Sequence, residues 1–289
     1  MPEIPHAGIF PAGQPVPEGI VPEGALGTPE AASPAAGAPR AVFNPAAVFP
    51  SGGDVVDGTQ FVNSGLDILR DPAAPFVVTF PTPGTYEYQD LFFGSVMRGR
   101  IVVEERGAAV ARAQAEIDQA VAEEEAALLE RGRALIAEHG QATATPQAGG
   151  PTPWDVLAGL TEGQIEIAAF LPAELTIKAG DTVRWTTERT ELEVHTATFA
   201  GGAEPPELIL VEPQEGGPPK LVINPEVLAP AGGPGYRGEG FTNTGFLSTA
   251  FPGFPAAAEL TFEAPGDYPY YCAIHGSPTS GMRGKITAT

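Results

Sequence analysis

The chain has 289 residues, a length that allows about two domains, and 36 Gly with 32 Pro residues, a density typical of loops and short strands. Its formal net charge of −21 makes nucleic acid a poor partner, because phosphate binding needs clustered Lys and Arg. A single cysteine excludes an intrachain disulfide. The sequence contains no run of about 18 apolar residues, so it predicts no membrane-spanning helix.

The chain begins with residues 1–6, which lack both the basic region and the apolar region of a signal peptide. The acidic composition favours solubility and could steer a basic partner. A solvated acidic surface is the simpler interpretation of that charge, and a dedicated docking face is the alternative.

Residues 104–138 are rich in Ala and Glu, contain no Pro and predict a long amphipathic helix. Its apolar stripe has spacings near three, four and seven and consists of Val110, Ala113, Ile117, Val121, Leu128 and Leu135. His139 and Gly140 are expected at its end, since Gly commonly stops a helix. The stripe would pack on a neighbouring sandwich of strands, or alternatively form an oligomer seam. Residues 141–160 then predict a Pro/Gly-rich linker.

The only cysteine lies near the end of the chain, directly after a predicted strand at Asp267–Tyr271. Cys272 is followed by His275 and Met282, and His195 lies 77 residues upstream. Thiolate, imidazole and a weak thioether are the ligands of a blue-copper centre. Each residue also has a simpler interpretation, because cysteine is often a buried small hydrophobe and Met282 could merely pack.

With these residues the chain resembles the cupredoxins, the plastocyanin-like family. The resemblance covers residues 166–289 and has four elements in the family's order, namely Ala179–Trp185, Val194–Phe199, Ala264–Cys272 and Gly284–Ala288. The chain departs from the plastocyanin pattern in its longer spacing between His275 and Met282 and in a Gly/Pro-rich insertion at about 200–240.

The resemblance implies a Greek-key β-sandwich that holds one type 1 copper, Cu(I)/Cu(II). His195 would end one strand, while Cys272, His275 and Met282 would lie on the C-terminal loop, with the methionine sulfur on the axis of the site. His275, on the exposed loop, would be the electron port. The Thr196 hydroxyl and the backbone amides near Gly276 are candidates for hydrogen bonds around the cysteine sulfur.

Segments of the first hundred residues recur in the second half of the chain, in the same order and at similar spacings, which indicates an internal repeat. The pairs are residues 40–45 with 220–225, 61–66 with 241–246, 79–86 with 261–268, and 97–101 with 282–286. The chain is therefore expected to be mainly β, with two cupredoxin units joined by the long helix.

The repeat aligns Cys272 with Asp90 and His275 with Phe93, so the first unit should not hold a blue copper. Its role would be structural or in protein contact. His6 aligns with His195, and nothing in the first unit matches residues 164–185. The first unit is therefore expected to be incomplete at its N-terminus, with strands and a signal peptide encoded upstream.

These patterns predict four regions: a degenerate unit at 1–103, a helical connector at 104–140, the linker at 141–160 and a copper domain at 161–289. The expected function is one-electron transfer to a redox partner, and not an enzyme activity. The expected location is outside the cytoplasm, with the protein periplasmic, secreted or at the outer surface. The alternative is copper storage or surface adhesion, in which redox is incidental.

Three further alternatives have less support from the residues. Multicopper oxidases and nitrite reductases need His-x-His pairs, and none of the four histidines has that spacing. A Cys-His nucleophile is possible in principle. Zinc also takes Cys and His ligands, but the methionine favours copper.

Overall fold

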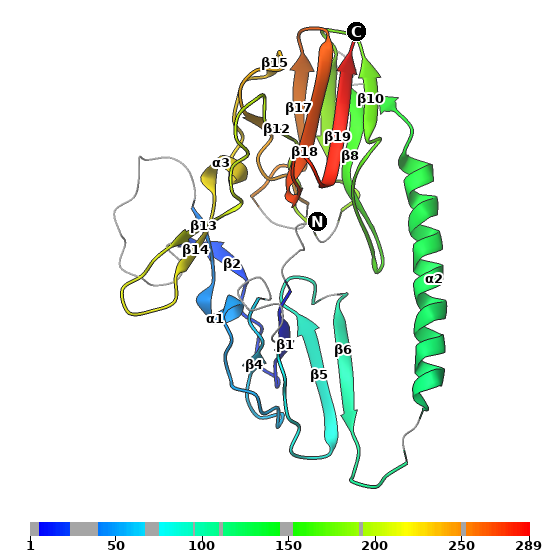
Figure 1. Cartoon of the computed structure of the whole chain (residues 1–289), viewed down its shortest axis with the longest axis vertical. Coiled ribbons are helices and arrows are strands. Elements are labelled where there is room, and N and C mark those ends of the chain that lie inside the picture. The colour runs from blue at the N-terminus through cyan, green and yellow to red at the C-terminus, as the bar shows by residue number, and fades with distance from the viewer. Residues whose placement is uncertain are drawn as a thin grey trace. The chain divides into compact units, whose positions relative to one another are not determined.

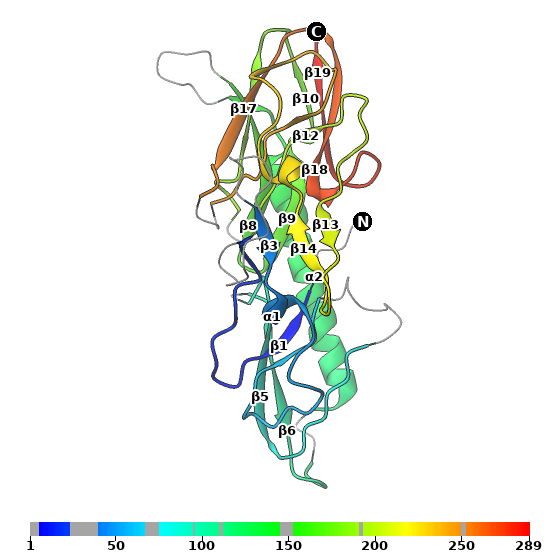
Figure 2. The same cartoon turned by 90° about the vertical axis from the view of Figure 1, so that its left-hand side faces the viewer.

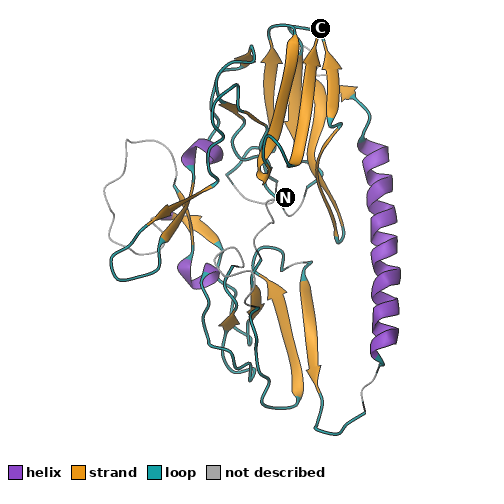
Figure 3. Ribbon diagram, in the orientation of Figure 1, coloured by secondary structure: helices purple, strands orange, loops and turns teal. Residues whose placement is uncertain are grey.

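The structure is a computed structural model that describes residues 6–23, 40–66, 75–94, 96–109, 112–144, 153–190, 193–249 and 253–289. Residues 145–152 of the predicted linker and Val110 of the predicted helix lie outside the described residues. The chain is mainly β with one long helix (Figures 1 and 3), so the predicted fold class is confirmed.

Two compact units divide the chain. The N-terminal unit comprises Pro5–Val121 together with Ile209–Ile223, and the C-terminal unit comprises Ala122–Leu208 together with Asn224–Thr289. The segment Ile209–Ile223 falls in the region that the sequence predicts as an insertion. It belongs to the N-terminal unit because it continues a sheet there.

The C-terminal unit is a sandwich of two sheets, which Figure 2 shows edge-on, with β17 on one side and β18 and β19 on the other. One sheet has the order β10–β19–β18–β12–β16, with the bounds Glu174–Ile177, Gly281–Ala288, Gly266–Gly276, Thr198–Phe199 and Thr242–Asn243. The other has the order β15–β17–β11–β8–β7, with β9 also on β8, and the bounds Gly235–Tyr236, Ala257–Phe262, Thr182–Thr186, Trp154–Glu162, Thr143–Ala144 and, for β9, Ile165–Leu171.

Aromatic side chains from both sheets fill the space between them. Trp185 of β11 is fully buried and lies edge-on to Phe199 of β12 and to Tyr270 of β18, with ring centroids 5.8 and 5.5 Å apart. Cys272 and Met282 belong to the same buried cluster. Strand alternation explains this placement: Tyr268, Tyr270 and Cys272 are two residues apart on one strand and so face the core together.

The N-terminal unit contains two further sheets. The first has the order β4–β1–β5–β6, with the bounds Val62–Asn63, Gly8–Phe10, Gly84–Asp90 and Arg98–Val103. The second has the order β13–β14–β3–β2, with the bounds Ile209–Glu212, Lys220–Ile223, Ala41–Phe43 and Ile20–Pro22.

In the second of these sheets, strands from the two halves of the sequence repeat pair directly. Val42 of β3 lies opposite Val222 of β14 in an antiparallel pair. Charged side chains cross between the halves as well: Arg40 bonds Glu212 at 2.6 Å and Lys220 bonds Glu23 at 2.7 Å. The hairpin β13–β14 therefore adds two strands to a sheet begun by β2 and β3.

The same hydrogen bonds recur at two short helices, α1 (Pro45–Val48) and α3 (Pro225–Leu228). An asparagine, Asn44 or Asn224, caps each helix with its side-chain oxygen, as N-cap residues do. The side-chain amide of Asn63 donates to the carbonyls of Ala47 in α1 and of Phe49, the residue that follows the helix. Asn243 donates to the corresponding carbonyls around α3.

The long helix α2 runs over Gln114–His139. Its end at His139 agrees with the sequence, whereas the predicted start at residue 104 is wrong. Residues 106–107 form a turn in which Gly107 has φ +91°, a value that a helix does not tolerate, and the Glu116 carboxylate accepts from the Ala113 N–H at the true start, as in a capping box.

Among the described residues of the predicted apolar stripe, Leu135 is the one that is buried on α2. Leu135 packs against Leu160, Ile167 and Leu171 of β8 and β9, and Arg131 binds Glu162 with two hydrogen bonds of 2.7 and 2.8 Å. The other apolar residues of the stripe on this helix are exposed, namely Ile117, Val121 and Leu128. The helix is thus attached through its C-terminal half, and an oligomer seam stays a prediction.

Candidate metal centre

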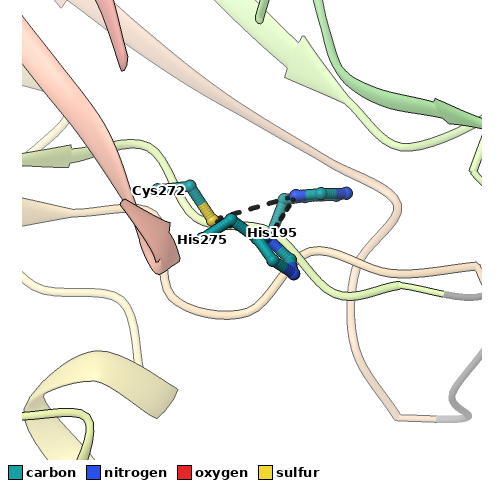
Figure 4. A group of neighbouring side chains, drawn as sticks. All are labelled: His195, Cys272 and His275. Carbon is teal, nitrogen blue, oxygen red and sulfur yellow. Dashed lines mark hydrogen bonds between the residues drawn. The ribbon is translucent and has the colours of Figure 1, made fainter. Parts of the chain in front are cut away.

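The side chains of Cys272 and His275 meet that of His195, which lies 77 residues upstream of the cysteine (Figure 4). Cys272 and His275 lie near the end of β18, where the pairing with β19 shifts register between Tyr271 and Gly276. His195 lies just before β12 and forms an isolated bridge with Leu247. All three are buried, and one donor atom from each lies within 4.8 Å of the other two.

The distances among the donor atoms suit a common metal ion. The Nδ1 atoms of His195 and His275 are 3.1 Å apart, and the Cys272 Sγ lies 3.8 Å from the first and 3.4 Å from the second. Ligands placed around one ion at ordinary metal–nitrogen and metal–sulfur distances lie roughly 3.3–3.8 Å from each other. The donor set of two imidazoles and one thiolate therefore fits a metal with nearly the spacing required.

The surroundings of Cys272 stabilise its thiolate. Burial alone raises the pKa of this thiol, but the nearby imidazoles of His275 and His195 reverse the effect and lower its pKa well below the usual value. The backbone N–H of Thr196 points at the sulfur, with the two atoms 3.5 Å apart. A thiolate stabilised in this way is able to bind a metal ion.

The predicted role of the Thr196 hydroxyl is wrong. That oxygen accepts a hydrogen bond from the Ala273 N–H at 2.8 Å and pairs with the Thr198 hydroxyl at 2.8 Å. The hydroxyl therefore joins β18, which carries Cys272, to the segment that carries His195, while the backbone amide of Thr196 reaches the sulfur. Gly276, the other predicted contributor, pairs with Gly281 across the hairpin.

His275 is not on an exposed loop, as the resemblance implied, but is buried, with 4 % of its surface exposed. Its Nε2 lies 3.0 Å from Oε2 of Glu193, which is buried as well. Burial lowers the pKa of His275, but the thiolate of Cys272 and the Glu193 carboxylate outweigh burial and raise that pKa to about 10. The outer edge of this imidazole is thus occupied by a carboxylate rather than by solvent.

His195 is held by close packing against a glycine in β8. A Cβ added to Gly159 would lie 2.3 Å from the His195 Nε2, and Gly159 has φ +84°, a conformation that L side chains rarely adopt. The register of β8 and β9 shifts at this point, between Ala158 and Leu160. The bulge and its glycine therefore provide the space that the His195 ring occupies.

A second, partly buried carboxylate lies near the first. Glu166 of β9 bonds the hydroxyls of Thr161 at 2.5 Å and Thr190 at 3.4 Å. Burial is the main cause that raises the pKa of Glu166 to about 7, and the charge of Glu193 adds to it. Of these two carboxylates, Glu193 bonds an imidazole, whereas Glu166 bonds only threonine hydroxyls and no candidate ligand.

Met282, the predicted axial ligand, is the second residue of β19 and is 2 % exposed. It packs in the same core cluster as Cys272. A tight turn at residues 277–280 separates β18 from β19, with the Ser277 N–H bonded to the Ser280 carbonyl at 2.8 Å. The predicted C-terminal loop is thus a hairpin, whose two strands carry the cysteine and the methionine.

The N-terminal unit contains an arrangement of the same kind with different side chains. His6 Nδ1 lies 3.1 Å from Oδ2 of Asp90, and the His6 ring is 5.6 Å from the ring of Phe93. The Ala7 N–H bonds the same carboxylate oxygen at 3.1 Å, as the Thr196 N–H does the cysteine sulfur. Met97, which the repeat aligns with Met282, is 48 % exposed.

Sequence reasoning missed two residues of the site, Glu193 and Gly159. Glu193 stands two positions before His195 and is therefore on the same side of the chain if that segment is extended. Gly159 interrupts an apolar run, a pattern that suggests a bulge or a close approach of backbone. Both signals are present in the sequence, but neither says which side chain the residue meets.

No protein-family model matches the chain, and no curated protein matches it. Among solved structures, a Cu(I) form of a mutant amicyanin is 21% identical, covers 52% of this chain and 99% of its own, and has a TM-score of 0.26. A reduced mutant amicyanin is 22% identical over 51% of this chain and 98% of its own, with a TM-score of 0.28. Amicyanin from Paracoccus versutus is 22% identical over 52% and 92%, with a TM-score of 0.27. These values are low, so function must be argued from the geometry of the site.

Proposed function

We propose that this chain is a blue-copper protein of the cupredoxin kind, which carries one electron at a time on a single type 1 copper. His195, Cys272 and His275 would hold the copper, and Met282 would be the weak axial ligand. The observation that supports this most is the convergence of two imidazole nitrogens and one buried thiolate within 4.8 Å. Two histidines with one cysteine in a plane and a long methionine contact are typical of blue-copper sites.

The fold brings these donors together before any metal binds, and binding of the metal would displace the proton from Nδ1 of His275. Both imidazoles present Nδ1 toward the sulfur, and the low pKa of Cys272 supplies the thiolate. The Thr196 amide and hydroxyl tie the two ligand strands together. When bound, the copper would supply a one-electron couple, and a frame that moves little suits both of its oxidation states.

The N-terminal unit would be a degenerate copy of the same domain without copper. The recurring bonds of Asn63 and Asn243 and the matching amide bonds to Asp90 and Cys272 support a duplicated origin. Asp90 and Phe93 offer no thiolate and no second imidazole at this place. The unit would then act in structure or in protein contact.

A carrier role, rather than an enzyme activity, is favoured by the single donor set. Among the described residues, one group of potential metal ligands is found, and its two histidines and one cysteine would suit a single ion. One such site exchanges one electron at a time, which suits transfer between proteins. A redox partner is therefore part of the proposal, as is a location outside the cytoplasm. No helix within the described residues is long and apolar enough to span a membrane.

Copper storage is the second candidate, and the burial of His275 is the observation that favours it. A carrier of this kind is expected to expose a ligand edge for electron exchange, whereas Glu193 covers that edge here. Storage would place the same ligands around Cu(I) and make slow exchange an advantage. The two candidates therefore predict different rates for the same bound metal.

Addition of copper to the purified chain tests the proposal. We expect one Cu(II) per chain and an intense blue thiolate-to-copper absorption band, which vanishes in Cys272→Ser. Asp90→Asn is the matched control in the N-terminal unit and should keep the band. A chain that binds zinc but forms no coloured copper complex would refute the proposal.

Stopped-flow oxidation of the reduced protein by a small inorganic oxidant separates the two candidates. Rapid, repeated cycling between the blue and colourless forms supports the carrier. A colourless protein that retains Cu(I) and reacts slowly supports storage.

A further inference from the structure

The most unusual feature of the site is the carboxylate beyond His275. Glu193 Oε2 lies 3.0 Å from the Nε2 of this imidazole, and both side chains are buried. The opposite nitrogen, Nδ1, faces the Cys272 sulfur at 3.4 Å and the His195 Nδ1 at 3.1 Å. One ring thus links the donor cluster to a buried carboxylate.

We propose that Glu193 is a positioning residue of the metal centre: in the metal-bound protein it would hold the ring of His275 with Nε2 protonated toward the carboxylate and Nδ1 directed at the copper. This inference rests on the proposed function and deepens it. A neutral imidazole carries its single proton on one nitrogen, and the hydrogen bond at that nitrogen decides which one. Carboxylate–histidine–metal arrangements of this type orient the ring and raise the basicity of the ligand.

The charge of Glu193 also bears on the oxidation state that the site prefers. A carboxylate hydrogen-bonded to a ligand increases the electron density on the metal-binding nitrogen, and its negative charge stabilises the more positive ion. Glu193 is therefore expected to favour Cu(II) over Cu(I) and to lower the reduction potential. If its loss weakens Cu(II) binding tenfold relative to Cu(I), the potential rises by about 59 mV.

The bonding of Glu193 points to this role rather than to a general structural one. Within the part of the chain that the structure describes, its Oε1 has no hydrogen-bond partner, so His275 is the contact that offsets the burial of the charge. Its own carbonyl accepts from the Ser248 hydroxyl at 3.1 Å, which anchors the backbone two residues before His195. The residue therefore connects the two histidines by its backbone and by its side chain.

Glu166 provides the matched control, because it is a partly buried carboxylate in the same region that bonds two threonines and no imidazole. Three variants are compared in the full chain: Glu193→Gln, Glu193→Ala and Glu166→Gln. Gln at position 193 keeps the size and an acceptor oxygen but removes the charge, whereas Ala removes the hydrogen bond as well. The probes are Cu(II), Cu(I) and the spectroscopically visible Co(II).

We expect affinity for Co(II) to fall about 10–100-fold in Glu193→Ala, the range typical for loss of such a partner, and less in Glu193→Gln. The reduction potential should rise in both variants and stay near the wild-type value in Glu166→Gln. With diamagnetic Zn(II) bound, a slowly exchanging ring N–H signal of His275 should be present in the wild type and lost in Glu193→Ala.

These readouts separate the inference from the proposed function. A wild-type chain that binds no copper overturns the proposed function. A wild type that forms the blue site, with potential, Co(II) affinity and ring N–H signal unchanged in both Glu193 variants, overturns the inference alone. Unfolding by urea identifies a variant that has only lost stability, and Glu193→Gln then serves as the decisive variant because it preserves size and an acceptor.

Discussion

The two units place three equivalent residues on the same backbone arrangement. In the C-terminal unit these are His195, Cys272 and His275, which can donate to a metal, and in the N-terminal unit they are His6, Asp90 and Phe93. In the C-terminal unit the Thr196 N–H approaches the Cys272 sulfur at 3.5 Å, and in the N-terminal unit the Ala7 N–H approaches the Asp90 carboxylate at 3.1 Å. The difference lies in how each acceptor is satisfied. The frame is therefore common to both, and the side chains decide whether a ligand is available.

Asp90 is saturated by the protein. Its Oδ1 accepts from the backbone N–H groups of Phe92 and Phe93 at 2.8 and 2.9 Å, and its Oδ2 accepts from Ala7 and lies 3.1 Å from His6. A carboxylate held by that many donors fastens a strand end to the segment before β1. The sulfur of Cys272 instead meets one amide at a long distance and two ring nitrogens, which leaves it able to bind a metal.

Rebuilding the missing donors in the N-terminal unit is the strongest test of this comparison. Asp90→Cys combined with Phe93→His restores a thiolate and a second imidazole opposite His6. If the backbone frame is sufficient, copper bound per chain should rise from one to two, as measured by metal analysis and by the doubled blue absorption.

Phe93→His alone keeps the hydrogen bonds of Asp90 and serves as the better-folded partner of the double variant. It should bind Co(II) at the new place without any thiolate band. If both variants fold, as circular dichroism reports, and neither binds an additional metal, the shared backbone does not suffice to make a site.

A substitution of Gly159 tests whether the space that this glycine leaves for the His195 ring is needed for copper binding. Gly159→Ala forces a left-handed residue and places a Cβ 2.3 Å from His195 Nε2, so we expect a loss of about 2–4 kcal/mol in stability together with weakened copper binding. Urea unfolding and copper titration measure the two effects.

Gly163→Ala is the matched control, because Gly163 has φ +61° and no atom within 4 Å of an added Cβ. It should cost about 1–2 kcal/mol from the backbone alone and leave copper binding intact. Equal loss of copper in both variants would show that backbone strain, and not the contact with His195, controls the site.

The smallest expected effect concerns Glu166, an acidic residue in the C-terminal unit that is held by threonines rather than by backbone amides. Folding raises its pKa from 4.5 to about 7, so its neutral form is favoured in the folded state. The stability that this group contributes is full below about pH 4.5 and is lost as the pH rises through 7, a change on the order of 2–3 kcal/mol.

Glu166→Gln should therefore flatten the fall in stability between about pH 4.5 and 7 and make the metal-free protein more stable at pH 8 than the wild type. Urea unfolding of chelator-treated protein across this range measures the difference. Glu174→Gln, at an exposed position of β10, should leave the profile of the wild type unchanged. A parallel fall in Glu166→Gln would assign the pH dependence to another group.

The sequence indicated the mainly β fold, the long helix and the cluster of candidate ligands before any coordinates. The density of Gly and Pro favours short strands, and the resemblance to cupredoxins implies a common site for Cys272, His275 and Met282. The helix was predicted to start ten residues too early, at residue 104 instead of Gln114. The Ala and Glu content predicts a helix there but does not reveal that the backbone turns at Gly107. The resemblance also implied that His275 lies on an exposed loop. The structure buries it, because a distant segment that contains Glu193 packs against its ring, and the local sequence does not reveal this contact.

What the sequence determined by itself is therefore the inventory: the only thiolate, the histidines that can accompany it, and a counterpart at Asp90 that cannot replace it. Only the tertiary structure decided how close these donors lie to one another and which residues contact them. It brought the Nδ1 atoms of two histidines that are 80 residues apart in sequence to 3.1 Å from each other. It also placed Gly159 against Nε2 of His195 and the Glu193 carboxylate against Nε2 of His275. Such contacts arise from the packing of distant strands, and a local pattern of residues carries no record of which strands will meet.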